Sequence, residues 1–196
     1  MNAIKRTITN EPVEVLGLIA GGTKMNNEEL AGRHFTTSAI HIVEQLWPRA
    51  ADRSISTELN DQTILMLALW SILRWERKVG LVALERMKVE PDALARDVNE
   101  SLHTACAEIR QQMGPPKLQK LPGGQLGVVV DFNTPLAPLL AAAEHEALEL
   151  GHSWVGSEHL LLAIVRLADP RLCDVLKMHG VNYGDLKETV VEILQT

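Results

Sequence analysis

Apolar residues recur with helical spacing along two stretches of the chain, and turn residues divide each stretch into four segments. Between Asn133 and Gly151, apolar positions return every three or four residues, which is typical of an amphipathic helix. Asn133-Thr134-Pro135 is a typical helix start, with Thr134 as the cap, and Gly151 is a typical helix end. The whole pattern predicts four helices, at about 135–150, 158–168, 170–178 and 185–194.

The first stretch repeats this order less regularly. Ile40, Val43 and Leu46 predict its first helix, and Pro48 is expected to kink that helix or end it early. The next segment is apolar on almost every face, which is typical of a helix buried at the centre of a domain. We therefore predict further helices at about 63–75, 79–87 and 92–104.

The two stretches align with each other without a gap. Residues 158–194 fall on residues 66–102 at a constant offset of 92 positions, which pairs aliphatic with aliphatic residues through two helices and the turn between them. This register indicates an internal duplication. A four-helix unit leaves an apolar face uncovered, and a second copy buries it. The sequence therefore predicts an all-α fold, with two tandem four-helix repeats packed as one pseudo-twofold eight-helix domain.

The boundaries follow from the repeats and from the glycines and prolines around them. We expect a partly flexible N-terminal extension at 1–33, a first repeat at 34–112, a linker at 113–131 and a second repeat at 132–196. Residues 34–196 form one double-repeat domain in this interpretation.

The composition excludes several classes of function. A net charge of −6 argues against a broad nucleic-acid-binding surface, which requires a basic face. Apolar runs fall far short of the roughly 20 residues that span a membrane, and Glu11 and Glu14 interrupt the stretch where a signal peptide would be apolar. Cys106 and Cys173 are too few for a disulfide scaffold and are expected to be reduced thiols. We predict a cytoplasmic protein with no nucleic-acid or membrane partner.

The segment from Gly151 to Ile164 carries the most specific polar pattern of the chain. A turn rich in glycine and serine leads into Ser157, then Glu158, and then an apolar run. Ser157 is predicted to cap the helix, and Glu158 in the first turn is favourable for the helix dipole. The alternative is that both residues also contact a ligand.

Enzyme and metal chemistry form the rival hypothesis. His145, His152 and His159 are spaced by seven residues, but His145-Glu146 lacks the second histidine that a metalloprotease helix requires four residues later. His152 falls in a turn, so structural or surface histidines are favoured. The thiols have no paired base, and the phosphate-binding loop Gly-x-x-x-x-Gly-Lys-[Ser/Thr] is absent from the sequence. We expect no catalytic residue, no metal and no cofactor.

Two tryptophans of the first repeat are assigned different roles. Trp70 aligns with Leu162 and is predicted to lie in the core. Trp75 follows the apolar run beside charged residues and is a candidate anchor for a partner, since tryptophan is enriched at binding hot spots.

The second repeat resembles a known family in its ordered motifs. These are Phe132 with Thr134, Leu150-Gly151-His152, Gly156-Ser157-Glu158-His159-Leu160-Leu161-Leu162, and Gly180-Val181. In this order they are similar to the Clp N-terminal repeat of ClpC- and ClpA-like AAA+ unfoldases, here without the ATPase modules. The first repeat keeps the aliphatic skeleton and lacks the polar signature.

The resemblance implies a non-catalytic module that recognises client proteins or adaptors for an ATP-dependent unfoldase. Two alternatives are an accessory subunit that docks on a Clp protease complex, and the N-terminal fragment of a larger Clp ATPase. In the ClpC-like branch, the acid of this motif helps to bind phosphorylated arginine. Here Glu158 remains, whereas its counterpart in the first repeat is Met66, so a two-site reader is not expected and a single site stays open. The candidate peptide-binding residues are Ser157, Glu158, His159 and Trp75.

Overall fold

The structure is a computed structural model, and it describes residues 34–52, 59–74, 79–113, 119–120, 126–127 and 133–195. The predictions for the N-terminal extension, for Trp75 and for most of the linker lie outside the described residues.

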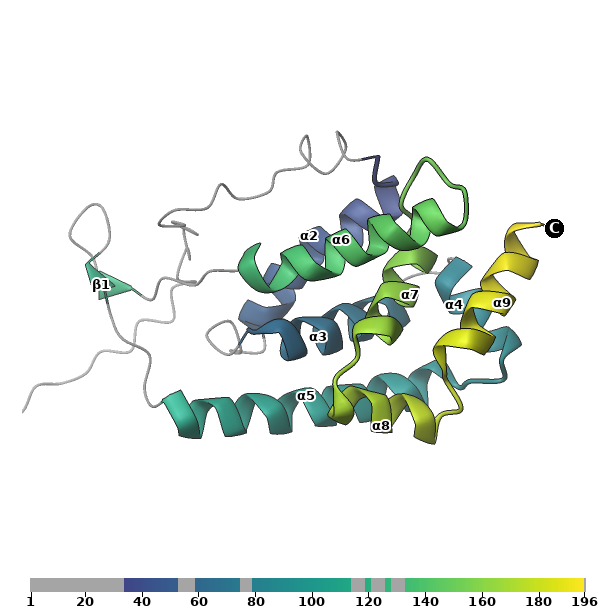
Figure 1. Cartoon of the computed structure of the whole chain (residues 1–196). Coiled ribbons are helices and arrows are strands. Elements are labelled where there is room, and N and C mark those ends of the chain that lie inside the picture. The colour runs from purple at the N-terminus through teal and green to yellow at the C-terminus, as the bar shows by residue number, and fades with distance from the viewer. Residues whose placement is uncertain are drawn as a thin grey trace, which may run out of the picture.

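Two sets of four helices make up the described structure (Figure 1). The first set comprises α2 (Thr37–Asp52), α3 (Asp61–Leu73), α4 (Val79–Arg86) and α5 (Pro91–Met113). The second comprises α6 (Asn133–Glu149), α7 (Ser157–Leu167), α8 (Pro170–Met178) and α9 (Tyr183–Leu194). Between the sets, β1 (Gln119–Lys120) and β2 (Leu126–Gly127) form one short antiparallel pair. The predicted all-α class is confirmed.

The packing follows the predicted twofold relation, in which α2 to α5 exchange with α6 to α9. Helices α3 and α7 pack against each other, between the layer of α2 and α6 and the layer of α5 and α8 (Figure 1). Contacts across the axis come in matched pairs: α4 packs on α9 as α8 packs on α5, and α3 packs on α6 as α7 packs on α2. The two copies therefore bury each other's apolar faces in one domain.

The turn between the third and fourth helices shows the duplication at the level of single hydrogen bonds. In the second copy, Gly180 has a φ of +72°, and the N–H of Val181 donates to the carbonyl of Leu176 at 2.8 Å. Ninety-two positions earlier, Lys88 has a φ of 62°, and the N–H of Val89 donates to the carbonyl of Leu84 at 3.0 Å. Both turns have the hydrogen bond of a Schellman motif.

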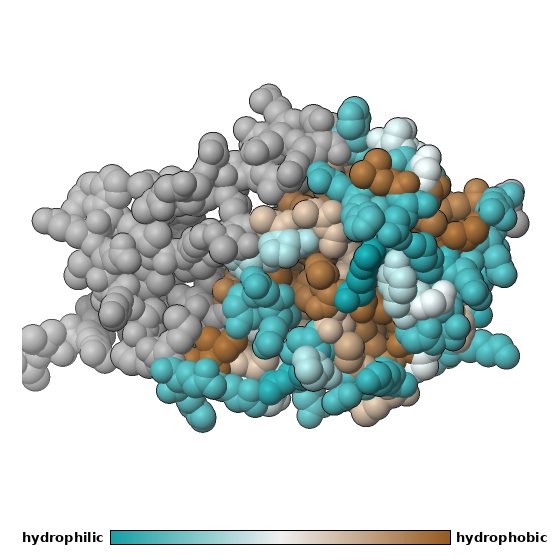
Figure 2. Space-filling model, viewed as in Figure 1, coloured by the Kyte–Doolittle hydropathy of each residue, from teal (hydrophilic) through white to brown (hydrophobic). Residues whose placement is uncertain are grey.

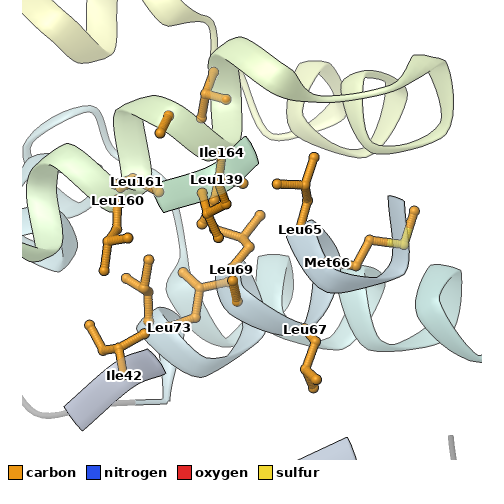
Figure 3. Packing of buried hydrophobic residues seen from close by; sticks show 14 of the residues in the cluster. Ile42, Leu65, Met66, Leu67, Leu69, Leu73, Leu139, Leu160, Leu161 and Ile164 are labelled. Atoms are coloured by element: carbon orange, nitrogen blue, oxygen red, sulfur yellow. The ribbon is translucent and has the colours of Figure 1, made fainter. Parts of the chain in front are cut away.

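The core is centred on α3, as its apolar pattern predicted. Ten of its residues are buried, including side chains on opposite sides of the helix. Leu65 and Leu69 point toward α7, whereas Leu67 points the other way (Figure 3). On the face shown in Figure 2, hydrophilic residues cover much of the surface, with hydrophobic residues between them. Trp70 is half-buried at the margin of this core, beside the Arg49 guanidinium.

Several helix bounds differ from those predicted. Helix α2 continues through Pro48 to Asp52, because Leu46 and Ala50 are buried on either side of the proline and their packing outweighs one lost hydrogen bond. Helix α5 runs to Met113 instead of about 104, and Glu108 in this extra length pairs with Arg171 of α8 at 2.6 Å. Helix α3 starts at Asp61, two residues before the predicted Thr63, because Asn60 caps it.

Candidate functional site

The predicted site lies at the start of α7, where the cap differs from the prediction. Gly156, with φ −103° and ψ −177°, is the N-cap, and Ser157 is the first helical residue. The prediction that Ser157 caps the helix was therefore wrong. Its Oγ donates instead to Glu158 Oε2 at 3.3 Å. A glycine at the N-cap supplies no side-chain acceptor for the first-turn amides.

His159 closes the first turn. The N–H of Gly156 donates to His159 Nδ1 at 2.8 Å, which is half of a capping box made with an imidazole. Because Nδ1 accepts, the proton of the neutral ring is on Nε2, and Nε2 lies 2.9 Å from Nδ1 of His152. Burial, with a smaller contribution from His152, lowers the pKa of His159 to about 4. His159 is therefore a neutral structural ring at neutral pH.

Glu158 folds back over Gly156 and is buried. A Cβ atom on Gly156 would lie only 2.6 Å from Glu158 Oε2 and 2.7 Å from Cδ, so the glycine makes room for this carboxyl group. Oε1 lies 3.3 Å from His159 Nδ1 and has no hydrogen-bond partner among the described residues. Desolvation raises the pKa of Glu158. The helix start thus holds a buried carboxyl group with unused hydrogen-bonding capacity.

A short loop from Leu150 to Gly156 covers this group and carries two aromatic rings. The ring of Trp154 stacks on His152 at 4.9 Å between centroids and meets His159 edge-on at 5.4 Å. Trp154 remains 38% exposed, so the stack presents one apolar face outward.

The first copy holds the loop in place from the other side. Val155 pairs with the start of α2: its N–H donates to the carbonyl of His34, and its carbonyl accepts from the N–H of Thr36. Helix α4 also approaches closely, since a Cβ on Gly80 would lie 3.3 Å from the carbonyl oxygen of Ser157. The candidate site therefore lies where the two repeats meet.

The structure brings together three of the four predicted site residues. Ser157, Glu158 and His159 are adjacent at the helix start, each at most 3% exposed, while Trp75 lies outside the described residues. Sequence reasoning missed Trp154, the exposed ring of the same loop. Its position between Gly151 and Gly156 was a usable signal, because an aromatic residue in a glycine-bounded turn has few neighbours to bury it.

A second polar cluster, also missed, joins α6, α7 and α9. Glu146 is fully buried, and its carboxylate accepts from Arg166 at 2.9 Å and from the Tyr183 hydroxyl at 2.8 Å. Lys187 donates to Glu149 at 2.5 Å and to the Tyr183 hydroxyl at 3.1 Å. Glu146 lies on the apolar stripe of its helix, three residues after Ala143, which is a signal for a buried acid that requires a partner.

The three histidines spaced by seven residues are divided between these two clusters. His152 and His159 contact each other, and His145 lies 3.4 Å from Glu149 in the second cluster. Within the described ranges, no three histidine, cysteine or acidic side chains come together in an arrangement that would hold a metal ion. No helix in the described part of the chain is long and apolar enough to cross a membrane.

Comparison with known proteins gives a family for the second copy. Residues 131–196 match the family described as Clp repeat (R) N-terminal domain. The chain is 30% identical over 87 residues to the chloroplastic ClpA homolog of Brassica napus, named as an ATP-binding subunit of the ATP-dependent Clp protease. It is 30% identical over 99 residues to chloroplastic chaperone protein ClpC3 of Oryza sativa, and 29% identical over 107 residues to chaperone protein ClpB of Oceanobacillus iheyensis.

These matches are partial on both sides. They cover 44%, 50% and 54% of this chain, and 10%, 10% and 13% of the three relatives. The chain thus spans about a tenth of the length of the relatives that it matches. Within that length, the match of residues 131–196 contains all four helices of the second copy, from α6 to α9. Over this second repeat, the chain is therefore similar to the Clp repeat (R) N-terminal domain family.

Proposed function

We propose that this protein is a non-catalytic protein-binding module of the Clp chaperone and protease system, which recognises client proteins or adaptors for an ATP-dependent unfoldase. The observation that carries the proposal is the family match over a complete four-helix repeat, together with relatives named as Clp ATPase subunits and chaperones. The proposal keeps the cytoplasmic location predicted from the sequence, although two of the relatives are named as chloroplastic.

The loop over the start of α7 offers a suitable contact surface. Trp154 is a partly exposed ring, and its stacking on His152 and His159 holds it in one orientation. A preoriented aromatic ring loses little conformational entropy on binding, which favours its use as an anchor. His159 contacts the Trp154 ring, and Ser157 and Glu158 precede it at the start of α7, so a partner that binds Trp154 lies near the Glu158 carboxyl group.

A guanidinium group is the ligand group that best complements the Glu158 carboxyl group. Oε1 of Glu158 has no hydrogen-bond partner in the described part of the chain, and a guanidinium donates two parallel bonds to a carboxylate. A phosphorylated arginine would add an anionic group, which the amides of a helix start can receive. The proposal therefore includes one phosphoarginine-type site at Glu158. Met66, its counterpart in the first copy, is fully buried within α3 and has no carboxyl group.

The second candidate function is an accessory subunit that docks on a Clp protease complex, and the observation in its favour is the match to a protein named as an ATP-binding subunit of the ATP-dependent Clp protease. A client receptor binds unfolded or phosphorylated peptides directly. An accessory subunit co-purifies with protease rings in a fixed ratio and has no affinity for such peptides. An N-terminal segment of a longer ATPase would bind peptides but exist only as part of that longer chain.

The test is affinity co-purification of the tagged chain from its native lysate, read by mass spectrometry, with Trp154→Ala and Glu158→Gln in parallel. Leu148→Ala is the matched control, because Leu148 is 74% exposed and lies outside the loop. We expect a Clp ATPase or protease subunit with the wild-type chain and a reduced client set with Trp154→Ala. A folded bait that recovers no Clp component would contradict the proposal.

Direct peptide binding then separates the two candidate functions. Fluorescence anisotropy with a peptide that contains phosphoarginine, and with the same peptide containing arginine, measures the Glu158 site. We expect Glu158→Gln to bind the phosphoarginine peptide with about tenfold lower affinity, because one charge-assisted hydrogen-bonded pair is lost. If wild type and Glu158→Gln bind the phosphoarginine peptide with equal affinity, the role of Glu158 is limited to the structure of the helix start.

A further inference from the structure

The second polar cluster surrounds a pocket that is separate from the helix start of α7. The pocket has a volume of about 440 Å³ and is lined by Glu149 of α6, Val165 and Arg166 of α7, and Tyr183 and Lys187 of α9. Val165 and the Tyr183 ring supply apolar surface. Arg166 and Lys187 lie over the Tyr183 ring, at 5.9 Å and 5.5 Å from its centroid. The pocket thus combines an aromatic surface with two cations.

The two cations converge on one carboxylate that the chain itself supplies. Glu149 accepts from Lys187 at 2.5 Å and lies 3.6 Å from Arg166. The hydrogen bond from Lys187 holds the pKa of Glu149 below its usual value, and the same bond raises the pKa of Lys187. The pocket therefore already shows the geometry in which it holds a carboxylate.

Glu149 differs from the other acid of the cluster in how easily it can leave. Glu146 is fully buried beneath Arg166 and Tyr183, whereas the Glu149 side chain is 32% exposed at the last residue of α6. Rotation of the Glu149 side chain into solvent requires no change in the helix. What remains is a preformed receptor in which Arg166 and Lys187 face one buried acid, Glu146, with a net charge of +1.

We propose that this pocket receives an acidic side chain from a partner protein, which replaces Glu149 between Lys187 and Arg166. Glu149 is then an internal competitor that occupies the site in the free protein and returns when the partner leaves. The occupant is an aspartate or glutamate in an exposed peptide segment. The overall net charge of −6 disfavours a polyanion such as a nucleic acid, whose long-range repulsion would exceed the attraction of a single +1 site.

The test uses the full chain and a fluorescein-labelled glycine–serine peptide that contains a single glutamate, with the same peptide containing glutamine in its place as the control ligand. Glu149→Gln removes the competitor, and we expect it to bind the glutamate peptide roughly tenfold more tightly than wild type. Glu188→Gln is the matched control, because Glu188 is exposed on α9 and has the same charge change. Lys187→Met in the Glu149→Gln background should lose that gain, and Lys177→Met, an exposed lysine of α8, should keep it.

Each alternative outcome overturns the proposal in a defined way. If Glu149→Gln and Glu188→Gln bind the glutamate peptide with equal affinity, only the net charge of the protein affects binding. If the glutamine peptide binds as tightly as the glutamate peptide, the pocket does not recognise a carboxylate. If inorganic phosphate at constant ionic strength displaces the peptide with higher affinity than the peptide itself, the occupant is a small anion instead of a protein. If Lys187→Met does not fold, as judged by circular dichroism, the comparison of Glu149→Gln with Glu188→Gln decides alone.

Discussion

In the central helices of the two copies, α3 and α7, the N–H of the N-cap residue donates to the side chain three residues later, but the accepting side chains differ. In α3, the N–H of the cap residue Asn60 donates to Thr63 Oγ1 at 2.9 Å, and Asn60 in turn accepts from the N–H of Thr63. In α7, the N–H of Gly156 donates to His159 Nδ1 at 2.8 Å, and the glycine offers no side chain in return. The first copy has a complete and unreactive cap, whereas the second has an incomplete one built from a titratable ring and covered by a loop.

The register of the two starts explains why the polar signature is found in only one copy. At the offset of 92, Ser157 corresponds to Leu65, yet α3 begins four residues earlier at Asp61. The first copy therefore has one additional helical turn where the second has the loop with Gly156. Leu65 and Met66 lie within this continuous helix and are buried. Of the two central helices, α7 is the one whose N-cap residue offers no side-chain hydrogen bond, and the buried Glu158 lies at this start.

The ends of the same two helices also differ, and the largest expected effect concerns them. Arg74 and Arg166 occupy equivalent positions, but Arg74 pairs with Asp92 on the surface, where the Asp92 side chain is 90% exposed, whereas Arg166 pairs with the fully buried Glu146. Arg166→Ala leaves a buried carboxylate with only Tyr183 and the more distant Lys187. We expect a loss of about 3 kcal/mol in the free energy of unfolding, measured by urea denaturation.

Arg74→Ala is the control in the first copy. An exposed ion pair contributes about 0–1 kcal/mol, so this variant should unfold close to the wild-type midpoint. Equal losses in the two variants would mean that burial of the partner acid does not distinguish the two positions.

Acidification should destabilise the second copy's helix start and leave the first unaffected. The folded-state pKa of His159, about 4, lies below its ordinary value of 6.5, so the unfolded chain binds a proton that the folded chain excludes. The stability contributed by the neutral ring is present above pH 6.5 and is lost as the pH falls toward 4. We expect a loss on the order of 2–3 kcal/mol over this range, measured by denaturation at several pH values.

His159→Thr places at this position the residue that the first copy uses. This variant should be less stable at pH 7, because a small side chain leaves a cavity beside Trp154, but its stability should depend less on pH between 6.5 and 4. Unchanged pH dependence would assign the acid sensitivity to another group.

Gly156 offers a third way to sharpen the comparison. Gly156→Ala adds a Cβ that meets the folded-back Glu158 carboxyl, so we expect a loss of about 1–2 kcal/mol in the free energy of unfolding. The double variant with Glu158→Ala should recover much of that loss, since the colliding group is gone, and thermal denaturation of all four forms completes the cycle. Additive losses would show that the steric conflict lies with the backbone and not with Glu158.

The helix order and the packing of two copies were predictable from the sequence, because apolar spacing records burial and both copies bury the same positions. The helix starts were harder to predict, since a single cap residue such as Asn60 or Gly156 determines where a helix begins. The identity of Glu158 was predictable from its motif, but its burial was not. The start of α7 is enclosed by α4, where a Cβ on Gly80 would lie 3.3 Å from the carbonyl oxygen of Ser157, and by the loop that Val155 joins to His34 and Thr36, and these are contacts between residues far apart in the sequence.

The smallest expected effect concerns the turn that the two copies share. Lys88 has the left-handed φ of 62° that Gly180 adopts in the second copy, and such a conformation costs a residue with a Cβ about 1 kcal/mol relative to glycine. Lys88→Gly should therefore stabilise the protein by about 0.5–1 kcal/mol, and Gly180→Ala should destabilise it by a similar amount, both measured by urea denaturation. Because the hydrogen bonds of the two turns are equivalent, the two changes should mirror each other. A destabilised Lys88→Gly would show instead that the lysine side chain contributes more to the first copy's turn than its backbone strain removes.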